Sequence, residues 1–570
     1  MEACLLKMKF FLSSLLILSC SIESQIFNSQ AIVHPNVGKD GMVVTQHYLA
    51  TDVGHSILQK GGNAYDASIA VAFALAVVLP RAGNIGGGGF MLMHDGDTNK
   101  NYSIDYREIA PAGATKDMYL NKDGSVDKKR STQGALAIGV PGTVYGMWEV
   151  HKKFGSLPWK ELIKPAVDLA RNGFQISPFM ADALNSRYKK LGQFQNFKKI
   201  FYAEYPVAMH SNLVQVDLAN TLEIIAHKGA AGFYEGEIAE LIAGYMKSNN
   251  GLITKTDLRN YRPVWREPIQ ADYREYQIVT MPPPSSGGIH IIQMLNILEH
   301  YDLAALGHNS PTYTALLTEV MKYAYADRSK YLGDPDFFDV PVNELISKTY
   351  ADKIHQRIVL NKISPSEAIL PGDALQHESL DTTHFSIADK HGNVVSNTYT
   401  LNSGFGSGVV IDGTGILMNN EMDDFVSSPG VPNQFGLVGG EANKIEPFKR
   451  PLSSMTPTLV FHDNQPIIAT GSPGGSRIIT AVLQFLLNTL DFKMEISDAT
   501  VVPRIHHQWK PDVLMLEKGF DEIHVETIRS LDQEVYISGP GTSLESLEIK
   551  NNLFYGFGDT RRPDSKAKGL

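Results

Sequence analysis

The run Asp381, Thr382, Thr383, His384 places two hydroxyl groups and an imidazole at the start of a strand-like segment. A threonine hydroxyl is a weak nucleophile because its pKa lies far above neutrality. If the chain is cut before Thr382, the new α-amine, with a pKa of about 7.7–8.0, can take the hydroxyl proton. On this interpretation the same hydroxyl first attacks the Asp381 carbonyl and so makes the cut. Taken alone, these residues are a weak signal for a nucleophile, and they more often mark the ordinary beginning of a strand.

Two other pairs of functional side chains are close in sequence but poorly oriented for a shared site. His506 and His507 are adjacent, and so are Asp423 and Asp424. Adjacent residues in an extended segment point in opposite directions, so neither pair suits a metal ion or a two-carboxylate site. In each pair we expect one buried, hydrogen-bonded side chain and one solvated side chain.

The sequence motifs of several common enzyme classes are missing. The chain contains no GxxxxGK[ST], no HExxH and no GxSxG, and the glycine run 86–89 lacks the spacing of a dinucleotide-binding loop. These absences argue against a phosphate-binding P-loop, a zinc peptidase and a hydrolase with a nucleophile elbow.

The composition is that of a globular protein. Lys and Arg total 51 and Asp and Glu total 61, a net charge of −10, with 43% hydrophobic and 20% charged residues. An acidic chain of this kind argues against a nucleic-acid partner. The only cysteines are Cys4 and Cys20, so the chain after residue 20 contains no thiol. This excludes thiolate metal sites, a cysteine nucleophile and a disulfide framework there.

The first residues have the pattern of a secretory signal. Lys7 and Lys9 precede an apolar run at 10–18, which polar residues follow. The run is too short to span a bilayer, so we expect no transmembrane segment. We predict a signal at residues 1–24, with Met8 as an alternative start, and export to the bacterial periplasm. A lipid anchor at Cys20 is the secondary alternative.

The elements that must position these residues alternate between strand-like and helix-like patterns. Strands are predicted at 276–280, 459–462 and 467–470, and helices at 289–299, 312–328 and 478–490. A buried helix is predicted at 67–79, capped by Asn63 and ended by Pro80. The mixture indicates an α/β or α+β protein. Segment 361–380 is polar and expected to be exposed and flexible, and a strand pair with a turn at 389–393 follows it.

The residues around Thr382 belong to a longer set of motifs that resembles one family. From about Gly41 to Gly569 the chain resembles the γ-glutamyltranspeptidases (glutathione hydrolases), which are N-terminal nucleophile hydrolases. The matching motifs are GNIGGGGF (83–90), DYREIAP (105–111), PPPSSGGIH (282–290), YADRSKYLGD (325–334), TTHFS (382–386), TYTLN (398–402), NNEMDDF (419–425), RPLSSMTP (450–457), GSPGGSR (471–477) and HHQW (506–509).

The resemblance implies a self-cleaving α+β protein, a four-layer αββα sandwich in which two subunits share one core. The cut between Asp381 and Thr382 would give a large subunit, 25–381, and a small catalytic subunit, 382–570, which stay together as a heterodimer. The implied activity is transfer of the γ-glutamyl group from glutathione and other γ-glutamyl compounds to water, or to an amino acid or dipeptide acceptor. The resemblance implies no metal and no cofactor.

The resemblance also implies a role for each site residue. Catalysis would fall to Thr382 as the nucleophile, Thr400 as the hydroxyl that orients it, and the backbone N–H groups of Gly474 and Gly475 as the oxyanion hole. The substrate α-carboxylate would be bound by Arg107, Ser453 and Ser454. The substrate α-ammonium would be bound by Asn402, Glu421 and Asp424.

These residue types suit a zwitterionic amino acid. A guanidinium fork and hydroxyl donors match a carboxylate, whereas acceptors with negative charge match an ammonium. Glycines let backbone N–H groups approach the reacting carbonyl. On this assignment Asp424 is the functional member of its pair and Asp423 the structural one.

The chain departs from the family pattern at two positions. Glu421 stands where many bacterial members carry glutamine, which leaves activity intact but bears on acceptor preference. Phe435 stands where tyrosine is frequent, in the loop 429–440 that covers the substrate in bacterial members. Because the phenolic hydroxyl is missing, we expect a looser or purely apolar latch.

Two rival functions remain open. Side-chain acylases of β-lactams resemble this family, but the presence of Arg107, Asp424, Ser453 and Ser454 favours an amino-acid pocket. A non-catalytic secreted scaffold with the same fold is disfavoured because Thr382, Thr400, Gly474 and Gly475 are all retained.

Overall fold

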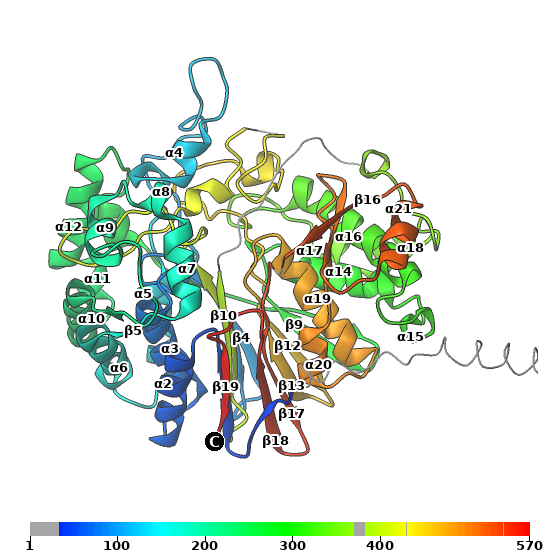
Figure 1. Ribbon diagram of the computed structural model, residues 1–570, viewed down its shortest axis with the longest axis horizontal. Coiled ribbons are helices and arrows are strands. Elements are labelled where there is room, and N and C mark those ends of the chain that lie inside the picture. The colour runs from blue at the N-terminus through cyan, green and yellow to red at the C-terminus, as the bar shows by residue number, and fades with distance from the viewer. Residues whose placement is uncertain (1–32, 370–381, 429, 540) are drawn as a thin grey trace, which may run out of the picture. The chain divides into compact units, whose positions relative to one another are not determined.

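The computed structural model describes residues 33–369, 382–428, 430–539 and 541–570. Two seven-stranded sheets lie face to face between two groups of helices (Figure 1). In order, the first sheet contains β1 (Asn36–Gly38), β18 (Leu553–Gly558), β17 (Glu545–Lys550), β13 (Gln465–Thr470), β12 (Thr458–His462), β9 (Tyr276–Thr280) and β8 (Ile269–Tyr273). The second contains β19 (Lys566–Gly569), β2 (Gly41–Thr45), β10 (Thr383–Asp389), β11 (Val394–Thr400), β3 (Gly88–Asp95), β4 (Lys100–Asp105) and β7 (Val264–Arg266).

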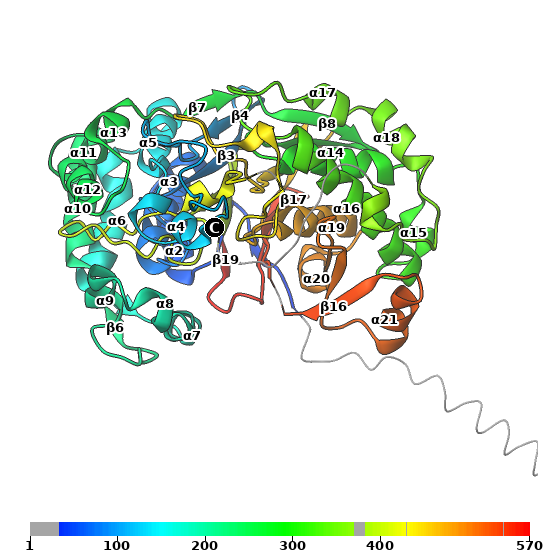
Figure 2. The ribbon, with the colours of Figure 1, turned by 90° about the horizontal axis from the view of Figure 1, so that it is seen from above.

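Helices cover the outer face of each sheet (Figure 2). The second sheet is covered mainly by α2 (Tyr48–Gln59), α3 (Ala64–Val78), α5 (Thr143–Phe154), α6 (Trp159–Asn172), α10 (Val216–Lys228), α11 (Ala231–Tyr234), α12 (Gly236–Ser248) and α13 (Lys255–Asn260). The first sheet is covered mainly by α14 (Gly287–Leu298), α16 (Pro311–Tyr331), α18 (Lys348–His355), α19 (Arg477–Leu490), α20 (Ile496–Val501) and α21 (Glu522–Arg529). Shorter elements include α4 (Lys128–Thr132), α7 (Pro178–Ser186), α8 (Tyr188–Leu191), α9 (Gln195–Phe201), α15 (Leu303–Leu306), α17 (Val342–Leu345) and the small sheet β14 (Ile505–His506), β15 (Val513–Glu517), β16 (Glu534–Ser538).

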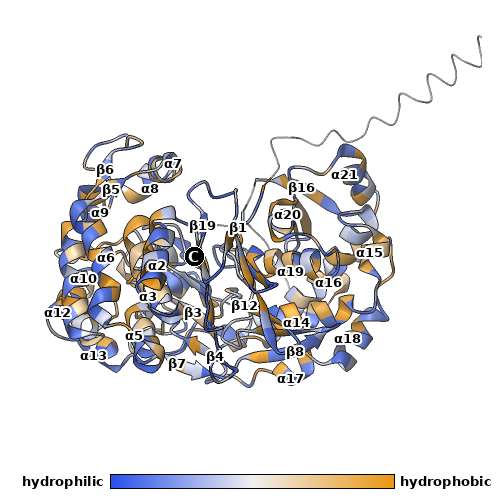
Figure 3. Cartoon of the chain, turned by 90° about the horizontal axis from the view of Figure 1, so that it is seen from below, coloured by the Kyte–Doolittle hydropathy of each residue, from blue (hydrophilic) through white to orange (hydrophobic). Residues whose placement is uncertain are grey.

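Apolar side chains fill the spaces between the layers, and Figure 3 shows hydrophobic residues in both sheets and in the flanking helices. Leu92, Val279 and Leu459 belong to the cluster between the sheets. Separate clusters pack α3 against the second sheet and α14 against β8. Neighbouring strands in both large sheets are antiparallel. The predicted four-layer α+β sandwich is therefore confirmed, and the α/β alternative is excluded.

The local patterns located several elements correctly. Helix α3 is capped by Asn63, whose side chain accepts from the backbone N–H of Asp66, and every residue of the helix is buried. Asp66 in turn accepts from the backbone N–H of Asn63, so the cap is reciprocal. A helix buried on all sides has no polar face, which explains its continuous apolar sequence.

Strands from both sides of Thr382 contribute to each sheet. In the first sheet β12 pairs with β13, which follows Thr382 in the sequence, and with β9, which precedes it. In the second sheet β10 and β11, which follow Thr382 in the sequence, lie between β2 and β3, which precede it. A single buried core therefore includes both parts of the chain.

The segment before Thr382 is described only to Ile369, and part of it is packed inside. Ile363, Ser366 and Ile369 are buried. The Trp509 Nε1–H group donates to the carbonyls of both Ser366 and Ile369, each at 2.9 Å. The predicted exposure of 361–380 is therefore wrong for Ile363, Ser366 and Ile369, and the contact with the indole accounts for the last two. Residues 370–380 lie outside the described part.

Among the residues that the structure describes, no helix is both long and apolar enough to cross a bilayer. The predicted signal at 1–24, with Cys4 and Cys20, and the cleavage-site residue Asp381 lie outside the described residues.

Candidate active site

The β10–β11 strand pair brings the two candidate threonines together. Thr383 pairs with Tyr399 across the two strands, so Thr382 lies beside Thr400. Their hydroxyl oxygens are 3.3 Å apart, and Thr382 is 7% exposed. The turn is fixed by Asp389, whose carboxylate accepts from the backbone of the turn residues that follow. The register of one antiparallel pair therefore determines this contact.

Thr400 is oriented by the residue two positions further along. The backbone N–H of Asn402 donates to the Thr400 hydroxyl oxygen at 2.8 Å, which leaves the hydroxyl proton able to point at Thr382. Asn402 itself has a positive φ of 74°. Its Nδ2 donates to the carbonyl of Asn420 at 3.1 Å, so its Oδ1 is the end that can accept from a ligand.

His384 is close to Thr382 in sequence but is unsuited to act as its base. Burial lowers the pKa of His384 to about 3. Its two ring nitrogens are bonded to the hydroxyls of Thr398, at 2.8 Å, and Ser386, at 3.0 Å. The imidazole is therefore neutral, weakly basic and held in the strand pair, so His384 is a poor candidate for the base of Thr382.

One cavity gathers nearly all the candidate residues. It is lined by Arg107, Arg328, Thr382, Thr400, Asn402, Glu421, Asp424, Phe435, Leu437, Ser453, Ser454, Met455, Gly475 and Ile478. Gly474 precedes Gly475 in the chain and does not line the cavity itself. Residues separated by more than 300 positions thus form one site.

Arg107 is the centre of a buried ion cluster. Its guanidinium donates to Glu421 Oε1 and, at 2.5 Å, to Asp424 Oδ2. It also donates to the carbonyls of Pro451, at 3.0 Å, and Leu452, at 3.2 Å, directly before the serine pair. Arg107 therefore bridges the residues predicted for the carboxylate and those predicted for the ammonium, a contact that the sequence did not indicate.

Burial and charge act in opposite directions within this cluster. Burial lowers the pKa of Arg107, but the neighbouring carboxylates outweigh it and raise that pKa above its ordinary value. Burial raises the pKa of Glu421 and of Asp424 above their ordinary values, and Arg107 offsets this only in part. Burial also raises the pKa of Glu108, 4.0 Å from Arg107, to about 8. In the described part of the chain Glu421 Oε2 accepts no hydrogen bond, so this acceptor can serve a ligand cation.

The serine pair is held by a neighbouring loop. The backbone N–H of Ser453 donates to the carbonyl of Pro284, and its own carbonyl accepts from the N–H and hydroxyl of Ser286. Ser454 Oγ accepts from Arg328 at 3.3 Å. These contacts fix the backbone from which both hydroxyls project into the cavity.

The glycine pair lies at the start of helix α19. Gly474 and Gly475 have φ angles of 134° and 55°, in the region that favours glycine. The carbonyls of the two glycines accept from Arg477 and Ile478 in the first turn of the helix. Backbone N–H groups here lie at the positive end of the helix dipole, where a developing oxyanion is stabilised.

The covering loop, described from residue 430 onward, is held by polar contacts. Phe435 is 5% exposed and lines the cavity. Asn433 Nδ2 donates to Asp424 at 3.3 Å, and the backbone N–H of Gln434 donates to Asp423 at 2.9 Å. The expected purely apolar latch is therefore corrected, because neighbours of Phe435 bond the loop to both aspartates.

The two adjacent pairs separate as predicted, but burial differs from expectation. Asp423 accepts from Ser131 at 2.6 Å and holds the loop, whereas Asp424 faces the cavity. His506 and His507 are both buried, so the expected solvated histidine is wrong. His506 forms a hydrogen bond with Thr480, and His507 forms one with Asp512. Within the described residues, no group of three or more His, Cys, Asp or Glu side chains could hold a metal ion.

Sequence reasoning missed Arg328, Met455, Leu437 and Ile478 in the cavity wall. Arg328 carried a signal that could have been used. It follows buried Met321, Ala324 and Tyr325 at helical spacing in α16, so it lies on the buried face of that helix.

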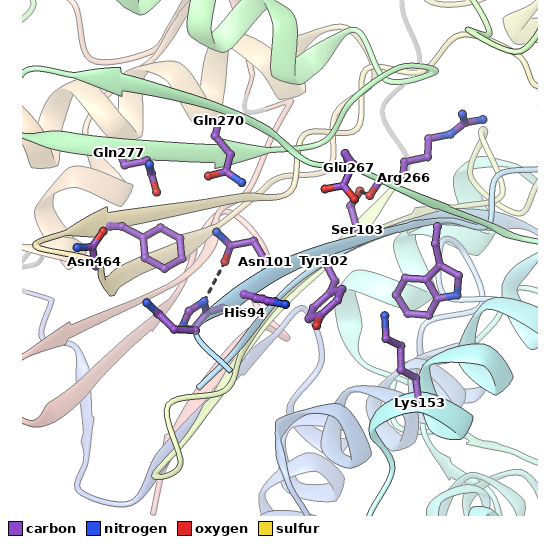
Figure 4. A pocket seen from close by; sticks show the side chains of 14 residues that line it. His94, Asn101, Tyr102, Ser103, Lys153, Arg266, Glu267, Gln270, Gln277 and Asn464 are labelled. Carbon is purple, nitrogen blue, oxygen red and sulfur yellow. Dashed lines mark hydrogen bonds between the residues drawn. The ribbon is translucent and has the colours of Figure 1, made fainter. Parts of the chain in front are cut away.

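A larger cavity, of about 690 Å³, lies between β4 of the second sheet and β8 and β9 of the first (Figure 4). His94, Asn101, Gln270 and Gln277 line it with other polar side chains, and none of the candidate site residues does. The smaller cavity around Thr382 is therefore the candidate active site.

Known proteins share this arrangement. Residues 50–569 match the family described as Gamma-glutamyltranspeptidase. Over 97% of its length the chain is 48% identical to a glutathione hydrolase proenzyme of Escherichia coli (strain K12), 94% of which is covered. A cephalosporin acylase from Bacillus halodurans aligns with a TM-score of 0.85 and 26% identity, over 96% of this chain and 99% of that chain. A γ-glutamyltranspeptidase from Helicobacter pylori aligns with a TM-score of 0.56 and 47% identity, over 58% of this chain and 96% of that chain.

Proposed function

The chain belongs to the γ-glutamyltranspeptidase family, and we propose that it cuts itself before Thr382 and uses that residue as its nucleophile. It is a γ-glutamyltransferase and glutathione hydrolase, and like its relatives it is made as a proenzyme. The observation that carries the proposal is the 3.3 Å contact between Thr382 and Thr400 in a cavity that also contains Arg107, Glu421 and Asp424.

Self-cleavage would use the hydroxyl of Thr382 on its own peptide bond. The oxygen attacks the carbonyl carbon of Asp381, the C–N bond breaks, and the acyl group passes from nitrogen to oxygen as an ester. This transfer already frees the α-amine of Thr382. Water then hydrolyses the ester, which leaves Asp381 with a carboxylate and restores the hydroxyl. That amine, with a pKa of about 7.7–8.0, becomes the base for later turnovers.

Transfer would follow two steps on the same hydroxyl. Thr382 attacks the γ-carbonyl carbon, its proton passes to the α-amine, and the N–H groups of Gly474 and Gly475 stabilise the oxyanion. The intermediate collapses to a γ-glutamyl ester as the leaving amine takes the proton. Water, an amino acid or a dipeptide then attacks the ester, and the hydroxyl is restored.

The ion cluster fits the two charged ends of a γ-glutamyl group. Arg107, Ser453 and Ser454 supply donors for the α-carboxylate. Asn402, Glu421 and Asp424 supply acceptors for the α-ammonium. A zwitterion adds one charge of each sign, so it can insert into the existing pairs between Arg107 and the two carboxylates without leaving an unpaired charge.

The proposed subunits are 25–381 and 382–570. Both large sheets contain strands from each side of Thr382, which supports the proposal that the two pieces stay together after the cut. The shared apolar layer would remain buried because cleavage changes no strand pairing.

The activity test uses three readouts on the purified chain. We expect release of p-nitroaniline from γ-glutamyl-p-nitroanilide, formation of a γ-glutamyl dipeptide when a dipeptide is added, and hydrolysis of glutathione. The acylase alternative is tested with glutaryl-p-nitroanilide, which lacks the ammonium. A preference for the glutaryl substrate would contradict the assignment of Glu421 and Asp424.

A methyl group at Gly474 should impair the oxyanion site. At a φ of 134°, a Cβ would lie 2.6 Å from Thr542 Cγ2 and 3.0 Å from the carbonyl of Gly541. The loop must shift to relieve this contact, so we expect Gly474→Ala to lower kcat by about 10²–10³-fold, the usual effect of losing one oxyanion donor.

The matched control for Gly474→Ala is Gly244→Ala in helix α12. A Cβ at Gly244 meets no atom within 4 Å, so activity should be unchanged. If Gly474→Ala also retained full kcat on γ-glutamyl-p-nitroanilide, the proposed oxyanion role of this loop would be wrong.

A phenolic hydroxyl at position 435 should tighten the covering loop. Phe435 is buried against the cavity, and its carbonyl already accepts from Gln508 at 3.2 Å. One further hydrogen bond contributes about 0.5–1.5 kcal/mol, so we expect Phe435→Tyr to lower KM by about two- to tenfold and to change the ratio of hydrolysis to transfer. Unchanged KM and an unchanged ratio in the same assay would count against a latch role.

We also propose that the first 24 residues are removed on export to the periplasm. The support is the sequence pattern of Lys7 and Lys9 followed by the apolar run 10–18. Mass spectrometry of the mature amino terminus from a bacterial host tests this: a start near residue 25 is expected, and a retained or lipid-modified Cys20 would contradict it.

A further inference from the structure

Arg328 lies in the wall of the Thr382 cavity, although the motifs assigned it no role. It extends from helix α16 and is 6% exposed. Its Nε donates to Ser286 Oγ at 3.0 Å, and its Nη2 donates to Ser454 Oγ at 3.3 Å. Arg328 therefore contacts Ser454 directly and Ser453 through Ser286.

The charge of Arg328 is paired differently from that of Arg107. Arg107 contacts Glu421 and Asp424 directly. In the part of the chain that the structure describes, Arg328 forms no ion pair, and its side-chain partners are hydroxyl groups. Burial lowers the pKa of Arg328 to about 10, with Tyr325 and Asp424 partly opposing this effect, so the group stays charged at neutral pH. A buried cation is costly unless an anion comes close to it.

The hydrogen bonds of Arg328 also direct two hydroxyl protons. Ser286 Oγ accepts from Arg328 and donates to the carbonyl of Ser453 at 2.7 Å, which fixes the backbone of that serine. Ser454 Oγ accepts from Arg328, so its own proton can be donated to a further acceptor in the cavity. An anionic oxygen beside Ser454 would receive this proton and the field of the guanidinium together.

We propose that Arg328 is a specificity-determining residue for the substrate α-carboxylate. It supplies a positive charge that forms no direct ion pair with Glu421 or Asp424, and it orients the Ser454 hydroxyl toward the carboxylate. The inference rests on the proposed function, because the α-carboxylate belongs to the γ-glutamyl group.

The test compares two substrates that differ only in the carboxylate. These are γ-glutamyl-p-nitroanilide and 4-aminobutyryl-p-nitroanilide, assayed at enzyme concentrations that give a measurable rate with each. For Arg328→Gln we expect kcat/KM to fall by about 10- to 100-fold on the first substrate, as for the loss of one charge-assisted hydrogen bond, and to stay within about threefold on the second. Arg328→Lys keeps the charge and should lose less than Arg328→Gln.

The matched control is Lys330→Gln, which removes one positive charge from the same helix at an exposed position outside the cavity. It should change neither substrate. Each variant is also run on a denaturing gel, so that only fully cut enzyme is compared.

Equal losses of Arg328→Gln on both substrates would overturn the proposal, since a purely structural role does not depend on the carboxylate. Equal losses for Arg328→Lys and Arg328→Gln on the γ-glutamyl substrate would overturn the role of the charge. Failure of the proposed function itself is distinguishable, because the unaltered enzyme would then release no p-nitroaniline from γ-glutamyl-p-nitroanilide.

Discussion

Replacing Thr382 with alanine should leave the chain uncut and lower turnover of γ-glutamyl substrates by about 10⁴- to 10⁶-fold, the range seen when a covalent nucleophile is removed. Alanine has no hydroxyl to attack either the Asp381 carbonyl or the substrate. The methyl group fills less space than threonine in a buried position, but the strand pair that follows does not depend on this side chain. A denaturing gel and the anilide assay measure both effects in one preparation.

Thr383→Ala is the matched control because it removes the neighbouring hydroxyl. Successive residues of a strand point to opposite faces, so Thr383 faces away from the Thr382 cavity. Thr383 is buried and does not line that cavity. This variant should still be cut and active. Retained cleavage in Thr382→Ala would show that Thr382 is not the nucleophile. Loss of cleavage only in Thr383→Ala would assign that role to Thr383.

Arg107→Gln should give the largest loss among the binding residues, with kcat/KM about 10²–10³-fold lower for γ-glutamyl-p-nitroanilide. In the proposed binding mode, two charge-assisted hydrogen bonds to the substrate carboxylate would be lost. Each contributes about 1.5–3 kcal/mol, and the glutamine amide would recover some of this. Glu421 and Asp424 also lose their buried cation. Breaking such a pair typically costs about 3–5 kcal/mol, so Tm should fall as well.

A double variant separates the binding effect from the stability effect. Arg107→Gln with Glu421→Gln removes one charge of each sign, so much of the lost Tm should return. Activity should stay low because the donor for the carboxylate is still missing. If activity returned together with Tm, Arg107 would be structural only. Arg171→Gln, at an exposed ion pair with Glu223, is the surface control and should change neither quantity.

The central strand pair was predictable because its signals are local. The turn at 389–393 and the alternating residues on either side fix the register, and this register alone puts Thr382 beside Thr400. Helix α3 was equally readable from its cap and apolar run. Patterns of this kind depend only on neighbours in the sequence, so they can be recognised before the fold is known.

The arrangement of the site was not predictable from the same patterns. The contact of Arg107 with Glu421 joins residues more than 300 positions apart, and nothing near either residue specifies it. The resemblance supplied both residues with separate roles, but not their direct ion pair. Likewise the loop contact between Asn433 and Asp424 arises only when two irregular segments fold over each other.

Burial was the property that residue types predicted least well. His506 and His507 are both inside, and Ser366 in a polar segment lies beneath Trp509. Polar side chains can be buried wherever the fold provides hydrogen-bond partners, and those partners come from distant elements. Arg328 is the clearest case of such burial, since hydroxyl groups from two other segments accept its hydrogen bonds.

Intact-mass analysis with amino-terminal sequencing of the purified protein tests most directly whether Thr382 becomes an amino-terminal nucleophile. We expect two chains, the smaller comprising residues 382–570 and beginning Thr-Thr-His-Phe. After brief exposure to a γ-glutamyl donor and acid quenching, that smaller chain alone should carry one added γ-glutamyl group, on its first residue. An uncut chain that hydrolyses γ-glutamyl-p-nitroanilide, or a γ-glutamyl group on any other residue, would contradict this role of Thr382.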